Sequence, residues 1–191
     1  MTARWVVDEV QAQRDLEITW QPISLLFKNE PPEDSPYYAA SAFTHNLLRV
    51  MESVRAAEGD GAIQELYWEF GRRIHHDGKR DFTAAEALEA VGLDTAHAAA
   101  FDDESFDAEI RSRMDAGLAL VGNDVGTPII GFDAPEMEGG KAGIFGPVIT
   151  RVPSTERSLE VWDAMATLSI TPGFWKLKRT RTERPEFGER P

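Results

Sequence analysis

The stretch Asp124-Val-Gly-Thr-Pro-Ile-Ile-Gly-Phe132 decides the predicted fold. Its first half is a loop by composition, and its apolar second half predicts a short buried strand over residues 129–132. Proline is tolerated at the first position of such a strand, because its missing N–H removes no interior ladder bond there. Glycines at 139, 140 and 143 are turn-like, so residues 142–145 are predicted to pair back as a hairpin. A helix is expected to begin at Pro153 and Ser154.

The N-terminal end of the chain predicts the same mixture of helix and strand. Residues 2–13 place their apolar side chains on one side of a helix. Residues 16–21 alternate apolar and polar, which predicts a half-buried strand bounded by Pro22. Apolar residues from 23 to 27 are expected to continue in an extended conformation.

Between these ends lies a long segment that reads as helical. Apolar residues recur at helical spacing over residues 38–57 and 63–74. Thr83 and Glu86, three residues apart, predict a capping box at the start of a short helix ending near residue 91. Further helices are expected over residues 95–101 and 104–121. Strands and helices at both ends, with helices between, indicate an α/β core that carries an all-helical insertion.

Charge and cysteine content exclude several classes of protein. The 191 residues include 20 Lys+Arg and 33 Asp+Glu, a formal net charge of −13, and no cysteine. Neutralising phosphates takes a basic face, so we expect no nucleic-acid partner and no binding to anionic membranes. Without cysteine the chain has no disulfide, thiolate zinc site or cysteine nucleophile. No segment reaches the ~18–20 apolar residues of a membrane helix, and the N-terminus lacks secretory signal features, so the cytoplasm is the expected compartment.

No self-contained catalytic motif is present. His75 and His76 are adjacent and point in different directions on a helix, so they chelate poorly, and no metal site is predicted. Ser/His/Asp catalysis lacks a nucleophile-elbow signature. The glycines near residue 140 are not followed by the Lys-Ser/Thr of a phosphate loop. We therefore predict no catalytic residue in this chain.

A set of short motifs, in order along the whole chain, resembles one known family. The chain looks like the DsbA-like, thioredoxin-fold family of mycothiol-dependent nitroreductases. The Val-Gly-Thr-Pro loop and the Arg-Thr-Arg-Thr-Glu segment are its most specific features. The motifs are Thr2-Ala-Arg-Trp-Val-Val-Asp-Glu-Val10, Arg14-Asp-Leu-Glu-Ile18, Ile23-Ser-Leu25, Asn29-Glu30, Gly71-Arg-Arg-Ile-His75, Asp124-Val-Gly-Thr-Pro128, Phe145-Gly-Pro147 and Lys178-Arg-Thr-Arg-Thr-Glu183.

The resemblance implies a cytoplasmic thiol reductase, often a homodimer, that uses mycothiol as reductant on disulfide or nitro-compound substrates. It implies a cis Thr127–Pro128 bond, with the main chain of Thr127 presented to an extended thiol substrate. By the same resemblance the substrate-binding residues are Thr127, Pro128, Asn29 and Tyr37. No bound cofactor is expected.

The active site of that family is a Cys-Pro-Trp-x motif at the start of the first helix, where the helix dipole lowers the thiol pKa. This motif is absent from the sequence, and Met1 would fall about five positions after the cysteine. We expect Met1 to be an internal residue of a longer protein, and the alternative is a decayed or repurposed relative. An in-frame stretch of DNA upstream of Met1 that encodes Cys-Pro-Trp would support the longer protein, and an immediate stop codon would contradict it.

The predicted fold is therefore α/β, a thioredoxin-like fold with a large helical insertion and without its first, central strand. Residues 1–32 and 122–173 would form the core, residues 33–121 the insertion and residues 174–191 a basic tail of net charge +3. The predicted function is a thiol-dependent oxidoreductase by resemblance, inactive as this cysteine-free chain. Two alternatives stay open: a non-redox protein that binds a thiol or peptide in the proline groove, and a serine-type isomerase or transferase that uses a thiol cofactor.

Overall fold

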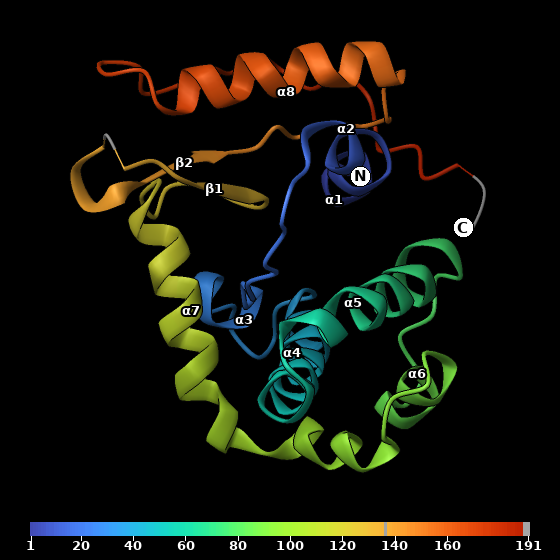
Figure 1. Cartoon of the computed structure of the whole chain (residues 1–191). Helices are drawn as coiled ribbons and strands as arrows, with labels where there is room; N and C mark the ends of the chain where they lie inside the picture. The colour runs from blue at the N-terminus through green and yellow to red at the C-terminus, as the bar shows by residue number, and fades with distance from the viewer. Residues whose placement is uncertain (136, 189–191) are drawn as a thin grey trace. The chain divides into compact units, whose positions relative to one another are not determined.

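A computed structural model describes residues 1–135 and 137–188 and divides the chain into two compact units (Figure 1). The first unit contains Met1–Ile18 and Ala116–Gly188, and the second contains Thr19–Asp115. Residues 189–191 of the predicted basic tail lie outside the described residues. The domain boundaries expected from the sequence, at 32/33, 121/122 and 173/174, are not tested by this division and remain predictions.

The first unit combines helices with a small sheet. The N-terminal helix runs through α1 (Thr2–Trp5), a π-helical stretch (Val6–Val10) and α2 (Gln11–Arg14), which confirms the predicted helix. Strands β1 (Ile129–Asp133) and β2 (Lys141–Phe145) form an antiparallel pair in which Gly131 lies opposite Gly143. Helix α8 (Thr155–Ser169) starts at Ser154, whose hydroxyl accepts the N–H of Arg157.

Aromatic side chains form the centre of the first unit. Trp5 is fully buried, and its ring lies 5.9 Å from that of Trp162 in α8. The ring of Phe132 in β1 approaches Trp162 at 5.7 Å in an edge-on arrangement. The N-terminal helix, the sheet and α8 therefore share one hydrophobic cluster.

The second unit is built from helices. Its elements are α3 (Leu25–Asn29), α4 (Tyr38–Glu58), a 3₁₀ turn (Asp60–Ala62), α5 (Ile63–Gly71), a π-helical stretch (Arg72–His76), α6 (Ala84–Ala90), 3₁₀ segments at Thr95–Asp102 and Glu104–Phe106, and the greater part of α7 (Asp107–Ala119). The predicted capping box is present, with Glu86 N–H donating to the Thr83 hydroxyl and Thr83 N–H donating to the Glu86 carboxylate.

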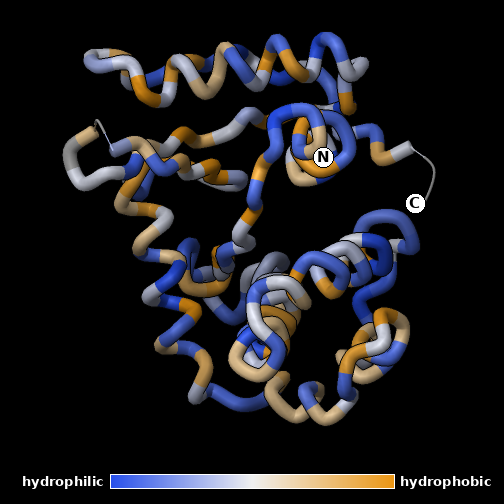
Figure 2. The backbone as a smooth tube through the Cα atoms, viewed as in Figure 1, coloured by the Kyte–Doolittle hydropathy of each residue, from blue (hydrophilic) through white to orange (hydrophobic). Residues whose placement is uncertain are grey.

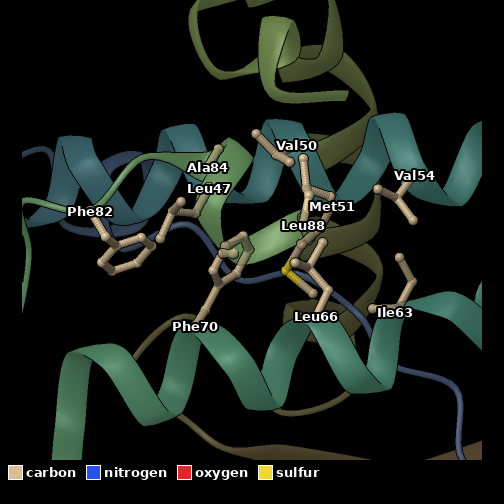
Figure 3. Close-up of a cluster of buried hydrophobic side chains, with 11 residues drawn as sticks. Leu47, Val50, Met51, Val54, Ile63, Leu66, Phe70, Phe82, Ala84 and Leu88 are labelled. Atoms are coloured by element: carbon tan, nitrogen blue, oxygen red, sulfur yellow. The ribbon is translucent and has the colours of Figure 1, made fainter. Parts of the chain in front are cut away.

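Facing stripes on α4 and α5 form the core of this unit. In Figure 2 these helices alternate between hydrophobic and hydrophilic residues along their length. In Figure 3 the side chains of α5 point toward those of α4, with residues of α6 beside them. The buried cluster consists of Leu47, Val50, Met51, Val54, Ile63, Leu66, Phe70, Phe82, Ala84, Ala87 and Leu88.

Two local predictions are wrong. Residues 16–21 form no strand, because the strands of the described residues are β1 and β2, which pair with each other and leave this segment without a neighbour. Trp20 packs on helices instead: its ring stacks on Tyr67 at 4.8 Å and its carbonyl accepts a 2.7 Å hydrogen bond from Arg55. The apolar stretch before Asn29 is the helix α3 rather than an extended segment, because Ser24 caps it.

The structure is thus mixed and helix-rich with a small two-stranded sheet, which is consistent with the predicted α/β class. The thioredoxin-like architecture itself stays a prediction. Within the described part of the chain, no helix combines the length and the apolar character that crossing a bilayer requires.

Candidate functional site

The predicted proline loop lies in the first unit, at the head of β1. The Thr127–Pro128 peptide bond is cis, as is the Gly146–Pro147 bond that follows β2. The N–H of Gly146 donates to the Pro128 carbonyl at 2.8 Å, which joins the two loops. The hydroxyl of Thr2, at the start of the first helix, donates to the Pro147 carbonyl at 2.7 Å.

Thr127 is accessible to a ligand in this loop. It is exposed, whereas Pro128 is half-buried. Among the described residues, the main-chain N–H and C=O of Thr127 have no hydrogen-bond partner. A free donor and a free acceptor on one residue, just before a strand, are what an extended ligand needs for β-type pairing.

The sheet behind this loop packs closely against Leu120, most tightly at Gly143. A Cβ on Gly143 would lie 2.6 Å from the Cβ of Leu120, and one on Gly131 would lie 3.0 Å from the Leu120 Cδ1. Leu120 therefore packs directly on the backbone of both strands. This contact supports the strand whose first residues follow Thr127.

The two other predicted binding residues lie in the second unit. Asn29 is the exposed last residue of α3, and Tyr37 precedes α4 with 74% of its surface exposed. Thr127 and Pro128 belong to the first unit. Asn29 is positioned by the anchoring of α3.

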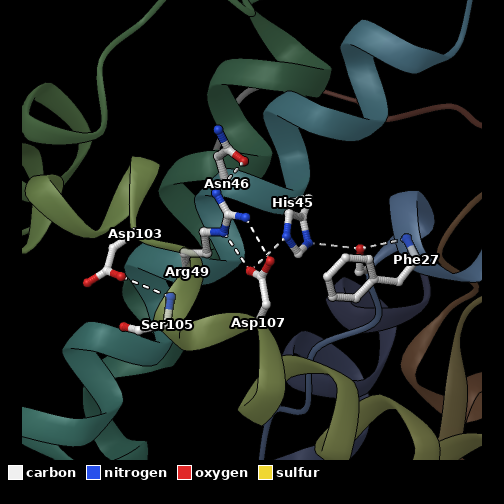
Figure 4. A network of polar contacts seen from close by, with 8 residues as sticks. Phe27, His45, Asn46, Arg49, Asp103, Ser105 and Asp107 are labelled. Carbon is white, nitrogen blue, oxygen red and sulfur yellow. Dashed lines mark hydrogen bonds and ion pairs between the residues drawn. The ribbon is translucent and has the colours of Figure 1, made fainter. Parts of the chain in front are cut away.

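A chain of buried polar contacts fixes α3 to α4 and α7 (Figure 4). The Ser24 hydroxyl accepts the N–H of Phe27 at 3.1 Å and lies 2.9 Å from His45 Nδ1. On the other side of the ring, His45 Nε2 lies 3.1 Å from a carboxylate oxygen of Asp107. Arg49 donates two hydrogen bonds to the same carboxylate, at 2.6 and 2.8 Å.

The protonation states follow from these partners. Burial lowers the pKa of His45 below its ordinary value despite the neighbouring Asp107, so the imidazole is neutral at pH 7. Burial alone would raise the pKa of Asp107, but the hydrogen bonds and the positive charge of Arg49, together with the contribution of His45, outweigh burial and hold the pKa below its ordinary value. The ionised carboxylate can only accept, so His45 Nε2–H donates to it. Nδ1 then accepts the hydroxyl proton of Ser24, and every group has a partner.

Ser24, His45 and Asp107 are the residue types of a catalytic triad. Ser24 is completely buried, however, and has no access to a substrate. Its hydroxyl oxygen is also occupied by the helix cap. The contacts therefore position α3 and Asn29 rather than supply a nucleophile. Ring contacts add to this anchoring, with Phe27 at 4.3 Å from the His45 ring and Arg111 over Phe27 at 4.2 Å.

Sequence reasoning missed this chain of contacts. His45 lies alone in the sequence and is 62 residues from Asp107, so no spacing connects them. Two signals were present: Ser24 directly before an apolar run is a typical helix cap, and His45 and Arg49 share one face of a helix.

The Gly71-Arg-Arg-Ile-His75 motif has a structural role in the same unit. The carboxylate of Glu69 accepts hydrogen bonds from Arg72 at 3.0 Å and from Arg73 at 2.7 Å. Arg73 also donates to the Glu86 carbonyl and lies over the Phe82 ring at 5.2 Å. Arg73 thereby joins α5 to α6. No group of three or more potential metal ligands occurs among the residues that the structure describes.

The fold is that of a mixed α/β protein with a proline loop directly before a strand and a second, helical unit. Residues 1–179 match the Rv2466c-like family, described as mycothiol-dependent nitroreductase Rv2466c. The chain belongs to this family. It is thereby placed among thiol-dependent oxidoreductases at the level of the family.

Proposed function

We propose that this chain binds a mycothiol-type thiol through the main chain of Thr127 and performs no thiol redox chemistry with its own 191 residues. The observation that carries the proposal is the exposed Thr127, whose N–H and C=O are unpaired among the described residues. Mycothiol contains amide groups next to its sulfur, which can pair with such a donor and acceptor as an added strand does. The family membership supplies the class of ligand.

The absence of cysteine supports the second half of the proposal. Thiol-dependent reduction proceeds through attack of a thiolate and a mixed disulfide. The sequence has no cysteine, so this chain cannot form such an intermediate with a bound thiol. Binding without turnover is the function that its own residues support.

The binding experiment is a titration of the ¹⁵N-labelled chain with mycothiol whose sulfur is methylated, which prevents oxidation. We expect saturable shifts at the amides around Thr127. Thr127→Ala keeps the main-chain donor and should bind as the unaltered chain does, whereas Thr127→Pro removes the N–H and should abolish binding. Melting curves of both variants show whether they fold. Equal binding by the two folded variants would refute main-chain recognition.

The activity experiment measures reduction of a nitroaromatic compound by mycothiol in the presence of the chain. We expect the rate of reduction to equal the rate measured without protein. Turnover that is insensitive to thiol-blocking reagents would contradict the proposal, because such activity would not need a cysteine.

A further inference from the structure

A small cavity opens in the helical unit at the start of α4. It has a volume of about 240 Å³ and is lined by Pro36, Ala39, Ala40, Phe43 and Arg80. A space of roughly 150 Å³ accommodates a benzene-sized molecule. The cavity is therefore large enough for one aromatic ring with a small substituent.

The side of the cavity that α4 forms is apolar, and its aromatic ring is held in place by other rings. The ring of Phe43 meets Phe82 edge-on at 5.4 Å and lies 5.9 Å from the ring of Phe101. Ala39 and Ala40 precede Phe43 by four and three residues, so both neighbour it on the surface of α4. Their small side chains leave open the space beside the aromatic ring. This surface suits a flat, apolar body.

The cavity also contains a cation without an intramolecular partner. Arg80 is exposed, and the structure pairs it with no carboxylate among the described residues. The other arginines between residues 19 and 115 are engaged: Arg49, Arg55, Arg72, Arg73 and Arg113 in ion pairs, and Arg111 over the ring of Phe27. An unpaired guanidinium beside a cavity can donate charge-assisted hydrogen bonds to an anion from outside.

The start of α4 adds to this preference. The helix has no side-chain cap and no acidic residue in its first turn. The N–H groups of Ala39 and Ala40 have no acceptor among the described residues, and both residues line the cavity. The positive end of the helix dipole thus acts in the same direction as Arg80.

We propose that this cavity binds a small organic anion with a flat apolar body, of the aromatic carboxylate class. The carboxylate would face Arg80 and the ring would lie against Phe43. This proposal does not depend on the thiol binding proposed at Thr127.

The test uses benzoate as the probe, with benzyl alcohol and acetate as ligands that lack the charge or the ring. NMR titration of the ¹⁵N-labelled chain should show saturable benzoate shifts at Ala39 and Ala40, and at least tenfold weaker binding of the other two. Unsaturable shifts, or acetate binding as tightly as benzoate, would overturn the proposal.

Four variants separate a built site from general charge attraction. Arg80→Gln should weaken benzoate binding at least tenfold, whereas Lys79→Gln removes the same charge next to the cavity and should change it less than twofold. Equal effects of the two would refute the role of Arg80. Ala40→Leu fills the cavity and should abolish binding. Ala39 is exposed, so Ala39→Leu provides a second filling variant if Ala40→Leu lowers the melting temperature.

Discussion

Replacement of Ser24 by alanine is the sharpest test of how the helical unit positions Asn29. The substitution removes a hydroxyl that accepts the Phe27 N–H at 3.1 Å and donates to His45 Nδ1 across 2.9 Å. Loss of a helix cap costs about 1 kcal/mol. A buried acceptor left without a donor costs about 1–3 kcal/mol, and His45 is only 1% exposed. The free energy of unfolding should therefore fall by about 2–4 kcal/mol.

The chain contains a matched control. Ser53 lies 2.9 Å from Nδ1 of His97, the same pair of atoms at the same distance. The side chain of His97 is 14% exposed, so water can reach the imidazole, and Ser53 caps no helix. Ser53→Ala should cost less than about 1 kcal/mol, as expected for one neutral hydrogen bond that water can replace.

Urea unfolding followed by circular dichroism measures both variants. With a denaturant slope of about 2 kcal/mol/M, Ser24→Ala should lower the midpoint by roughly 1–2 M. Hydrogen exchange of residues 24–29 should accelerate in the same variant, because α3 loses its anchor. A loss below about 1 kcal/mol, or a loss equal to that of Ser53→Ala, would refute the reasoning.

Two further predictions follow from the same structure. Burial lowers the pKa of His45 in the folded state, where Asp107, Arg49 and Arg111 face the ring. As the pH falls, the unfolded chain therefore takes up the proton first. The stability contributed by the neutral ring is complete above about pH 6.5 and is lost as the pH falls below that value. In His45→Gln the free energy of unfolding should vary less between pH 7 and pH 5, and an unchanged pH profile would contradict this. Gly143→Ala should destabilise the first unit by about 1–3 kcal/mol, because the new Cβ would lie 2.6 Å from the Cβ of Leu120. Gly117→Ala is the control, because a Cβ at this position would meet no atom within 4 Å. In thermal unfolding it should leave the stability unchanged or raise it by about 0.5–1 kcal/mol. Similar losses of stability in the two variants would refute the packing argument.

Elements whose signals lie within a few residues were predicted well. Helix α4 follows from its apolar spacing, the start of α6 from Thr83 and Glu86, and the β1–β2 hairpin from its glycine-rich turn. Each of these depends on contacts between residues near in sequence or on a periodic face. The segment at residues 16–21 failed because a strand also needs a partner, which its own alternation cannot supply.

The candidate site likewise has one part that was predicted from the sequence and one part that was not. The cis Thr127–Pro128 bond agrees with what the motif implies, and the family match covers residues 1–179. That Asn29 is carried on a short helix held by Ser24, His45 and Asp107 was not predicted. The chain of contacts was invisible because its members are 21 and 62 residues apart.

The sequence by itself determined the charge, the lack of a thiol, the helical periodicity and the family, since these depend on composition and on neighbouring residues. Only the tertiary structure decided which polar groups are buried and with what partners. His45 is buried away from water, so its polar atoms need the two hydrogen-bond partners that distant segments supply. Arg80 is exposed to solvent and has no carboxylate partner among the described residues. The difference between these two side chains lies in the distant elements that surround each of them.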